Sequence, residues 1–322
     1  MQYGSVSGID VPVSRLVQGT MMFDEENAEE AFRVYDAVFA MGCTAFDTAH
    51  VYGGGACQRT LGAWINDRGI RDRVVIIDKG AHPNADRRRV TTFDVASDLY
   101  DCLARLKTDY IDLFLLHRDA PDVPVGPIVD ALNEHREAGR IRAFGGSNWT
   151  HERLEKANEY AAAHGLEPFV ASSPNFSLAD QLEAPWEGCV SISGPSRAAA
   201  RAWYEANQMP VFSWSSLARG FLSGRYAQRD FETWPEEADE SVVRCYYCED
   251  NLTRLERARR LAKQKGLTVP QIALAYLFAQ PLNTFALVGC ETADEFRANA
   301  EALSVDLTEE ELAWLDLAID PS

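Results

Sequence analysis

Short apolar runs recur along the chain, and each ends in a polar residue capable of chemistry. CysThrAlaPhe ends at Asp47, ValValIleIleAsp at Lys79, and LeuPheLeuLeu at His117. A further run, IleArgAlaPheGlyGly, ends at Ser147. Consecutive end points are roughly 30 to 40 residues apart, which is the length of a strand followed by a covering helix. The pattern therefore predicts repeated strand–helix units.

The runs are continuous and do not alternate, as in parallel strands that are buried on both faces. Eight strands are expected, at residues 16–19, 44–47, 74–78, 111–116, 141–145, 169–172, 211–213 and 284–288. Apolar positions at helical spacing predict helices at residues 28–41, 58–68, 95–106, 127–138, 152–164, 197–207, 269–279, 293–303 and 309–317. Glycines and Pro12 between short apolar pieces predict a β-hairpin within residues 1–15. The expected fold class is α/β: a (β/α)8 TIM barrel with an N-terminal β-hairpin and extra C-terminal helices, forming one domain over residues 1–322.

The segment from Gly220 to Asn251 does not fit this repeat. It contains Pro235 and clustered acidic residues, and it follows the seventh predicted strand. Long loops in compact domains are usually functional or disordered. We interpret the segment as a flap over a bound ligand, with a plain surface insertion as the alternative.

Composition narrows the functional classes. The net charge of −18 argues against nucleic-acid and anionic-membrane partners, because both would be repelled. Seven cysteines at irregular spacing are typical of a reducing compartment, and Cys245 and Cys248 lack the partners of a zinc site, so we expect no metal. Neither a signal peptide nor a stretch of about 20 apolar residues is apparent, so the expected location is cytoplasmic.

Asp47, Tyr52, Lys79 and His117 form a candidate catalytic group, because the C-terminal ends of barrel strands open onto one rim. An ammonium near a phenol favours the phenolate, so Lys79 is expected to lower the pKa of Tyr52 and make it a proton donor. Asp47 would hold Lys79, and His117 would hydrogen-bond the substrate oxygen. This arrangement suits the reduction of a carbonyl group.

Over essentially its full length the chain resembles the aldo-keto reductase family. The segments that carry the resemblance are PheAspThrAla(46–49), ValTyrGly(51–53), AspLysGly(78–80) and LeuLeuHisArg(115–118), in the family's order and spacing. The resemblance implies Tyr52 as general acid, Lys79 as the residue that tunes it, Asp47 as the partner of Lys79, and His117 as the orienting group. It also implies a nicotinamide cofactor.

By the same resemblance, GlySerAsnTrp(146–149) contacts the nicotinamide amide, Trp214 stacks on its ring, and the segment after the seventh strand follows the pyrophosphate. Ser173 stands where the family usually has Gln. The cofactor-binding candidates are Gly19, Thr20, Met21, Ser147, Asn148, Ser173, Trp214, Ser215, Leu217, Gly289, Cys290, Glu291, Glu295 and Asn299.

The segment at residues 288–299 departs from relatives that prefer NADPH, which commonly place Lys or Arg there. This chain offers Gly289, Glu291 and Glu295, with Asn299 left for the adenine. A 2′-phosphate would be repelled by a nearby carboxylate, whereas ribose hydroxyls can donate to one. NAD(H) is therefore expected to be favoured over NADP(H), unless Arg297 reaches the phosphate.

The substrate-binding candidates around the mouth of the barrel are Met22, Phe23, His50, Arg118 and Trp149. Polar groups beside an aromatic face suit a sugar- or polyol-type carbonyl compound, although an Arg paired to the scaffold and a core-facing Trp explain the residues equally well. Two alternatives to carbonyl reduction stay open. One is NAD-dependent oxidation of a sugar or alcohol, and the other is a non-catalytic, cofactor-sensing regulatory subunit on the same fold. The oligomeric state is not predicted.

Overall fold

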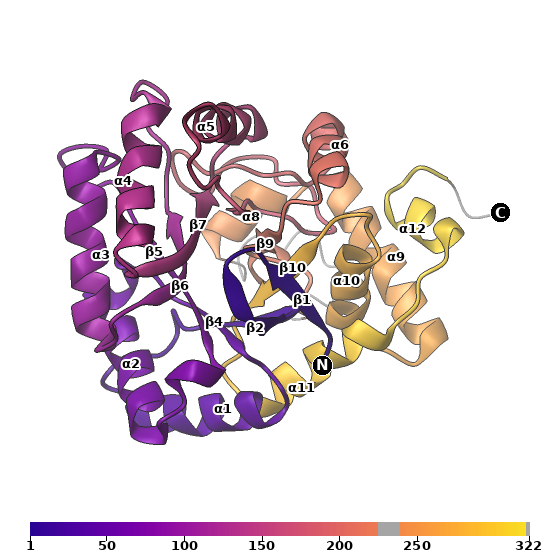
Figure 1. Ribbon diagram of the computed structural model, residues 1–322. Coiled ribbons are helices and arrows are strands. Elements are labelled where there is room, and N and C mark those ends of the chain that lie inside the picture. Colours follow the sequence, from indigo (N-terminus) through magenta and orange to yellow (C-terminus); the bar gives the residue numbers. More distant parts are fainter. Residues whose placement is uncertain (225–238, 320–322) are drawn as a thin grey trace.

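The computed structural model describes residues 1–224 and 239–319, and its centre is a closed barrel of eight parallel strands (Figure 1). The strands neighbour one another in the order β10–β3–β4–β5–β6–β7–β8–β9. Their bounds are β3 Leu16–Gly19, β4 Ala45–Asp47, β5 Val75–Gly80, β6 Ile111–Leu116, β7 Ile141–Ser147, β8 Ala171–Ser173, β9 Val211–Ser213 and β10 Thr284–Val288. The predicted (β/α)8 fold is confirmed, and four of the eight strands begin and end at the predicted residues.

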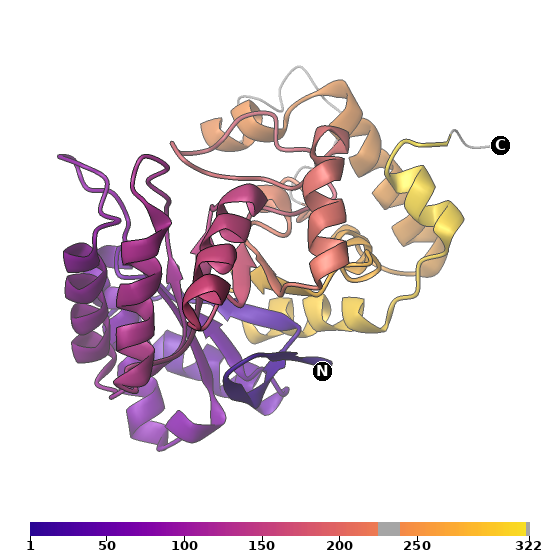
Figure 2. The same ribbon diagram turned by 45° about the horizontal axis from the view of Figure 1, so that its top comes forward.

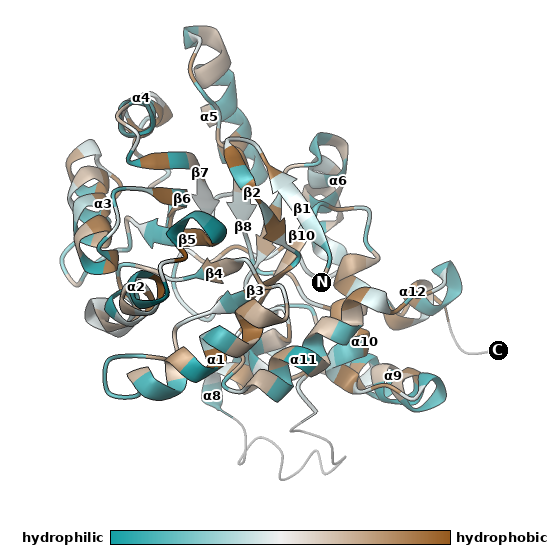
Figure 3. Cartoon of the chain, turned by 60° about the horizontal axis from the view of Figure 1, so that its bottom comes forward, coloured by the Kyte–Doolittle hydropathy of each residue, from teal (hydrophilic) through white to brown (hydrophobic). Residues whose placement is uncertain are grey.

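Helices surround the barrel (Figures 1 and 2). Those predicted from the sequence are α1 Ala28–Ala40, α2 Ala56–Arg68, α3 Thr92–Leu106, α4 Val125–Glu137, α5 His151–His164, α6 Ala198–Asn207, α10 Val269–Phe278, α11 Ala293–Glu301 and α12 Glu309–Leu315. Hydrophobic and hydrophilic residues lie on different faces of these helices (Figure 3). In α3, for example, Val95, Leu99, Cys102 and Leu106 are all buried. Helix α3 thus packs inward through one apolar stripe, whereas α10 is buried along most of its length.

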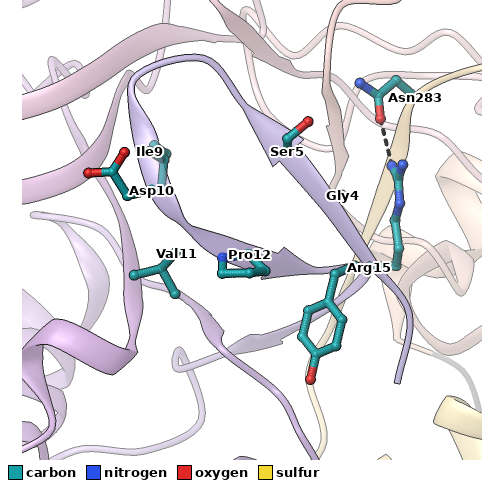
Figure 4. Close-up of a pocket in the computed structure, with 9 residues that line it drawn as sticks. Gly4, Ser5, Ile9, Asp10, Val11, Pro12, Arg15 and Asn283 are labelled. Carbon is teal, nitrogen blue, oxygen red and sulfur yellow. Dashed lines mark hydrogen bonds between the residues drawn. The ribbon is translucent and has the colours of Figure 1, made fainter.

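The N-terminal hairpin closes the end of the barrel opposite the strand C-termini. It consists of β1 Tyr3–Val6 and β2 Ile9–Ser14. Its Val6 and Val13 join the side chains that fill the barrel interior, among them Val75. Beside the hairpin lies a shallow cavity of about 490 Å³, bordered by Arg15, whose Nη1 donates to Asn283 (Figure 4).

In the described part of the chain, two α-helices were not predicted, α8 Glu240–Tyr246 and α9 Glu249–Lys265. The buried stripe of α9 contains four apolar residues, Leu255, Ala258, Leu261 and Ala262. The many charged residues between them made this short apolar pattern hard to recognise in the sequence. Of the proposed flap at 220–250, residues 225–238 lie outside the described part of the chain, and α8 occupies the segment after them.

All seven cysteines carry free thiols, including Cys245 in α8 and Cys248 just before α9. Among the described residues, none of the helices is long and apolar enough to cross a membrane.

Candidate active site

Four polar side chains lie where β4, β5 and β6 end at one rim of the barrel. Asp47 is the last residue of β4, Lys79 the penultimate residue of β5, and His117 directly follows β6. Tyr52–Gly55 is a short 3-10 turn soon after β4. A backbone hydrogen bond of 2.8 Å from His50 N to Lys79 O continues the strand ladder into this turn. The fold therefore brings all four predicted catalytic residues to one end of the barrel.

The Lys79 ammonium group is buried and has three hydrogen-bond acceptors. Its Nζ lies 2.7 Å from Asp47 Oδ1, 2.6 Å from Asp47 Oδ2 and 2.9 Å from the main-chain oxygen of Thr48. Burial lowers the pKa of Lys79, but Asp47 and Tyr52 outweigh it and the pKa is raised overall. Burial raises the pKa of Asp47 against the opposing charge of Lys79. Contacts of this length are typical of a charge-assisted pair, so we assign Lys79 as a cation and Asp47 as a carboxylate.

Tyr52 lies beside this ion pair and remains partly exposed. Lys79 Nζ is 5.1 Å from the centre of the Tyr52 ring, and the Tyr52 and His117 ring centres are 5.8 Å apart, edge to face. Burial raises the pKa of Tyr52 more than the charge of Lys79 lowers it, so the net shift is upward. This direction is opposite to the expectation from the sequence, because that argument counted the ammonium and not the loss of water. Tyr52 is a protonated phenol at neutral pH.

His117 is a neutral imidazole at neutral pH. Burial lowers its pKa well below the usual range, and the charges of Lys79 and Arg118 lower it further. Its Nδ1 is buried and has no hydrogen-bond partner within the described part of the chain. The His82 ring lies 4.9 Å from the His117 ring, so a second imidazole borders the site. His82 was not predicted from the sequence, because it lies two residues beyond the end of β5 and after Ala81, whose backbone is left-handed.

Asn148 connects two of the strand ends that were predicted to hold the cofactor. It adopts a left-handed backbone conformation (φ 58°) just after β7. Its side-chain Nδ2 donates to the main-chain oxygen of His117 and to Ser147, and its Oδ1 accepts from Trp214 Nε1 at 3.2 Å. The amide is therefore used within the protein, where it fixes the Trp214 indole. Ser173 Oγ, by contrast, is buried without a hydrogen-bond partner in residues 1–224 and 239–319.

Other cofactor candidates lie at the ends of β3, β9 and β10. Ser215 has a positive φ of 51°, so the chain turns sharply after β9, and Leu217 follows in the same partly buried segment. Thr20 directly follows β3 and is buried, whereas Met21 is exposed. A Cβ atom on Gly289 would lie 2.7 Å from the Met22 side chain. A larger residue after β10 would therefore require the flexible end of the Met22 side chain to move.

The segment after β10 has exposed acidic side chains and two buried residues beneath them. Cys290 and Asn299 are buried, and Asn299 Nδ2 lies 3.3 Å from Cys290 Sγ. Glu291 and Glu295 are exposed, and Glu295 Oε2 accepts from Glu291 N at 2.9 Å. Arg297 forms an ion pair with Asp294 one turn away on the same helix. The carboxylates are thus located near the start of α11, as the sequence predicted, and the nearby arginine is paired.

Two substrate candidates are part of the hydrophobic core. Phe23 is 2% exposed and packs edge to face on Tyr35, with ring centres 5.3 Å apart. Trp149 is 0% exposed and packs on Phe169 at 5.0 Å. In this structure both rings face protein and not the mouth of the barrel.

The two polar substrate candidates adjoin catalytic candidates: the main chain of His50 bonds to that of Lys79, and Arg118 follows His117. His50 Nε2 is 3.1 Å from Asp101 Oδ2, and this contact occupies one side of its imidazole. Arg118 is buried directly after His117. Within the described ranges, His, Cys, Asp and Glu side chains form no group of three that could hold a metal ion.

Comparison with known proteins identifies the family of this barrel. The profile of the Aldo/keto reductase family matches residues 15–320, so the chain belongs to the aldo/keto reductase family. Protein tas of Escherichia coli (strain K12) is 28% identical over 348 residues, which cover 98% of this chain and 97% of that protein. Aldo-keto reductase yakc [NADP(+)] of Schizosaccharomyces pombe is 27% identical over 294 residues, 88% of this chain and 80% of that one. The solved structure of the thermostable aldo-keto reductase Tm1743 with the inhibitor epalrestat has a TM-score of 0.75 and 25% identity, covering 98% of this chain and 99% of that chain. The family is one of oxidoreductases that act on carbonyl compounds with nicotinamide cofactors.

Proposed function

We propose that this protein reduces an aldehyde or ketone with a nicotinamide cofactor, and that Tyr52 donates the proton. The observation that carries the proposal is the buried Lys79 cation 5.1 Å from the Tyr52 ring, with the neutral His117 beside it. These three groups supply a proton donor, a fixed positive charge and a neutral hydrogen-bonding ring in one place.

The strand ends around the tetrad fit a nicotinamide cofactor. Buried oxygens at Ser173 and Thr20 lack hydrogen-bond partners within the described chain, and a ligand amide or phosphate would supply them. Trp214 would hold the nicotinamide ring, because Asn148 fixes its indole. When bound, the reduced cofactor supplies a hydride to the carbonyl carbon.

The protonation states favour reduction over oxidation near neutral pH. A Tyr52 pKa raised by burial keeps the phenol protonated, so it can give its proton to the carbonyl oxygen. Lys79 would stabilise the phenolate that results, and His117 would hydrogen-bond the same oxygen. Oxidation of an alcohol requires the phenolate as base, so the oxidative rate should rise toward alkaline pH.

We further propose that NAD(H) binds in preference to NADP(H). Glu291 and Glu295 are exposed where the adenosine ribose would lie, and Arg297 is already paired with Asp294. A carboxylate can accept from ribose hydroxyls but repels a 2′-phosphate. The Schizosaccharomyces pombe relative is named for NADP(+), so a preference for NAD(H) would distinguish this chain from that relative.

The substrate class that we propose is an aldehyde or ketone with polar substituents. His50 and Arg118 favour the sugar- or polyol-type interpretation, but the complete burial of Trp149 removes the aromatic face that it also invoked. A polar carbonyl compound is the form of the proposal that these positions support.

A spectrophotometric assay of NADH consumption tests the proposed function directly. The purified protein is mixed with NADH and, in turn, with each of a panel of aldehydes and ketones. We expect it to oxidise NADH, which is followed by the fall in NADH absorbance. If no carbonyl compound or alcohol is turned over while the cofactor binds, the regulatory-subunit interpretation replaces reduction.

A further inference from the structure

Arg118 is a buried cation beside the proposed reaction centre. It follows His117 in sequence and is 6% exposed. Its Nη1 donates to the main-chain oxygen of His117 at 2.8 Å, and its Nε donates to the main-chain oxygen of Glu187 at 3.3 Å. Trp149 Nε1 donates to the main-chain oxygen of Arg118, which fixes the backbone as well. The guanidinium is therefore held in one position.

Within residues 1–224 and 239–319, Arg118 has no carboxylate partner within ion-pair distance. Two partly buried arginines do have one: Arg71 lies 2.8 Å from Asp112, and Arg153 lies 3.1 Å from Asp119. Both acceptors of the Arg118 guanidinium named above are uncharged main-chain oxygens. Burying a charge without a counter-ion is costly, so such a position suggests that a ligand supplies the negative charge.

Among the described residues, the titratable groups whose pKa values Arg118 influences are uncharged at neutral pH. Burial raises the pKa of Cys189 and of Tyr52, and burial lowers the pKa of His117 and of His82; in each case the charge of Arg118 is a smaller influence. These groups come from four separate segments around the mouth of the barrel. None of these four groups therefore supplies a negative charge to the Arg118 guanidinium.

We propose that Arg118 receives the carboxylate of a substrate whose carbonyl group lies at Tyr52, so that the substrates are aldehydes or ketones that also carry an acid group. Arginine presents five N–H donors in a planar fork, and the two main-chain contacts and the contact with the Cys189 side chain leave donors free for a planar carboxylate. Since Arg118 adjoins His117, the acid group lies only a few atoms from the reducible carbon. This inference rests on the proposed carbonyl reduction and specifies its substrate.

A panel of carbonyl acids and their methyl esters tests the proposal. The carboxylate is placed one to four carbons from the aldehyde or ketone, and kcat/KM is measured with NADH for wild type, Arg118→Met and Arg118→Lys. For at least one spacing, the wild type should prefer the acid over its ester by at least about tenfold, mainly through KM. Arg118→Met should abolish that preference, and Arg118→Lys should retain part of it.

Arg88→Met is the matched control. Arg88 is half exposed and pairs with the side chains of Asp122 and Glu187, so its loss removes a cation near the same loop without touching the site. This variant should keep the wild-type preference for acids. If Arg118→Met lowers acid and ester rates equally, Arg118 only positions the loop at Glu187 and the proposal is overturned. Better turnover of a phosphorylated aldehyde than of every acid would also overturn it.

A binding measurement separates this inference from the proposed function. Calorimetric titration of the carbonyl acids into the cofactor-bound protein needs no turnover. If nothing is reduced but an acid binds wild type and not Arg118→Met, carbonyl reduction fails and the carboxylate site stands. If esters are reduced as well as acids at every spacing, reduction stands and the carboxylate site fails.

Discussion

Burial sets the charge state of each residue in the proposed site. The Lys79–Asp47 pair survives burial because the ammonium has three acceptors between 2.6 and 2.9 Å. Tyr52 and His117 have no such pairing, so loss of water keeps both of them neutral. The site therefore holds one fixed cation beside one neutral acid and one neutral imidazole, which is a suitable arrangement for giving a proton to a carbonyl oxygen.

We expect His117 to lower the stability of the folded protein at acidic pH. Because its folded-state pKa lies below the unfolded value of about 6.5, the unfolded state binds more protons below that pH. This contribution to stability is present above about pH 6.5 and is lost as pH falls toward the folded-state pKa. His117→Gln should therefore lose less stability than wild type between pH 7.5 and pH 5, measured by urea unfolding. The control is His164→Gln at the exposed end of α5; an equal effect of both changes would contradict the prediction.

Close packing between elements positions the turn that carries Tyr52. Helix α2 follows this turn directly and packs on α3. A Cβ atom on Gly62 of α2 would lie 2.5 Å from the main-chain oxygen of Leu106 at the end of α3. Only glycine allows this approach, so the α2–α3 contact helps to fix the position at which the turn that carries Tyr52 ends and α2 begins.

Gly62→Ala should destabilise the protein although alanine is the better helix former by about 1 kcal/mol. We expect a loss of about 1 to 3 kcal/mol in the free energy of unfolding, because the added methyl group separates the two helices. The neighbouring exposed position gives the control: Ala63→Gly should lose only the propensity difference. A Gly62→Ala protein more stable than wild type would show that the helices are not closely packed.

The same elements show what the sequence could and could not predict. Strand β6 was predicted with its bounds because five of its six buried residues are apolar, with Asp112 as the exception. Helix α9 was missed because its buried stripe lies among charged residues. The strand-end rule predicted Asp47, Lys79 and His117, but His82 follows Ala81, whose left-handed φ of 60° is not visible in sequence. The internal use of the Asn148 amide and the missing counter-ion of Arg118 are tertiary features that a sequence does not display.

At the scale of the whole molecule, the net charge of −18 opposes every anionic ligand, and its local distribution decides which one binds. The preference between NADH and NADPH tests whether the overall charge or the charges near the cofactor determine binding. We predict tighter binding of NADH than of NADPH, measured as dissociation constants by fluorescence titration. Glu291→Gln with Glu295→Gln should narrow the difference by improving NADPH binding.

The matched control changes the net charge equally at another place. Glu309→Gln with Glu310→Gln alters two exposed carboxylates at the start of α12, and it should leave the cofactor preference unchanged. Tighter NADPH binding by the wild type would refute the role given to Glu291 and Glu295. An equal effect of both double variants would assign the preference to overall charge.

The role of Tyr52 as proton donor is tested most directly by Tyr52→Phe, which removes one oxygen and keeps the ring beside Lys79. The measurement is the single-turnover rate of carbonyl reduction, with the NADH dissociation constant determined on the same protein. We predict a rate lower by about 10²- to 10⁴-fold with NADH affinity essentially unchanged. A variant that reduces carbonyl compounds at a rate close to that of the wild type would contradict the account.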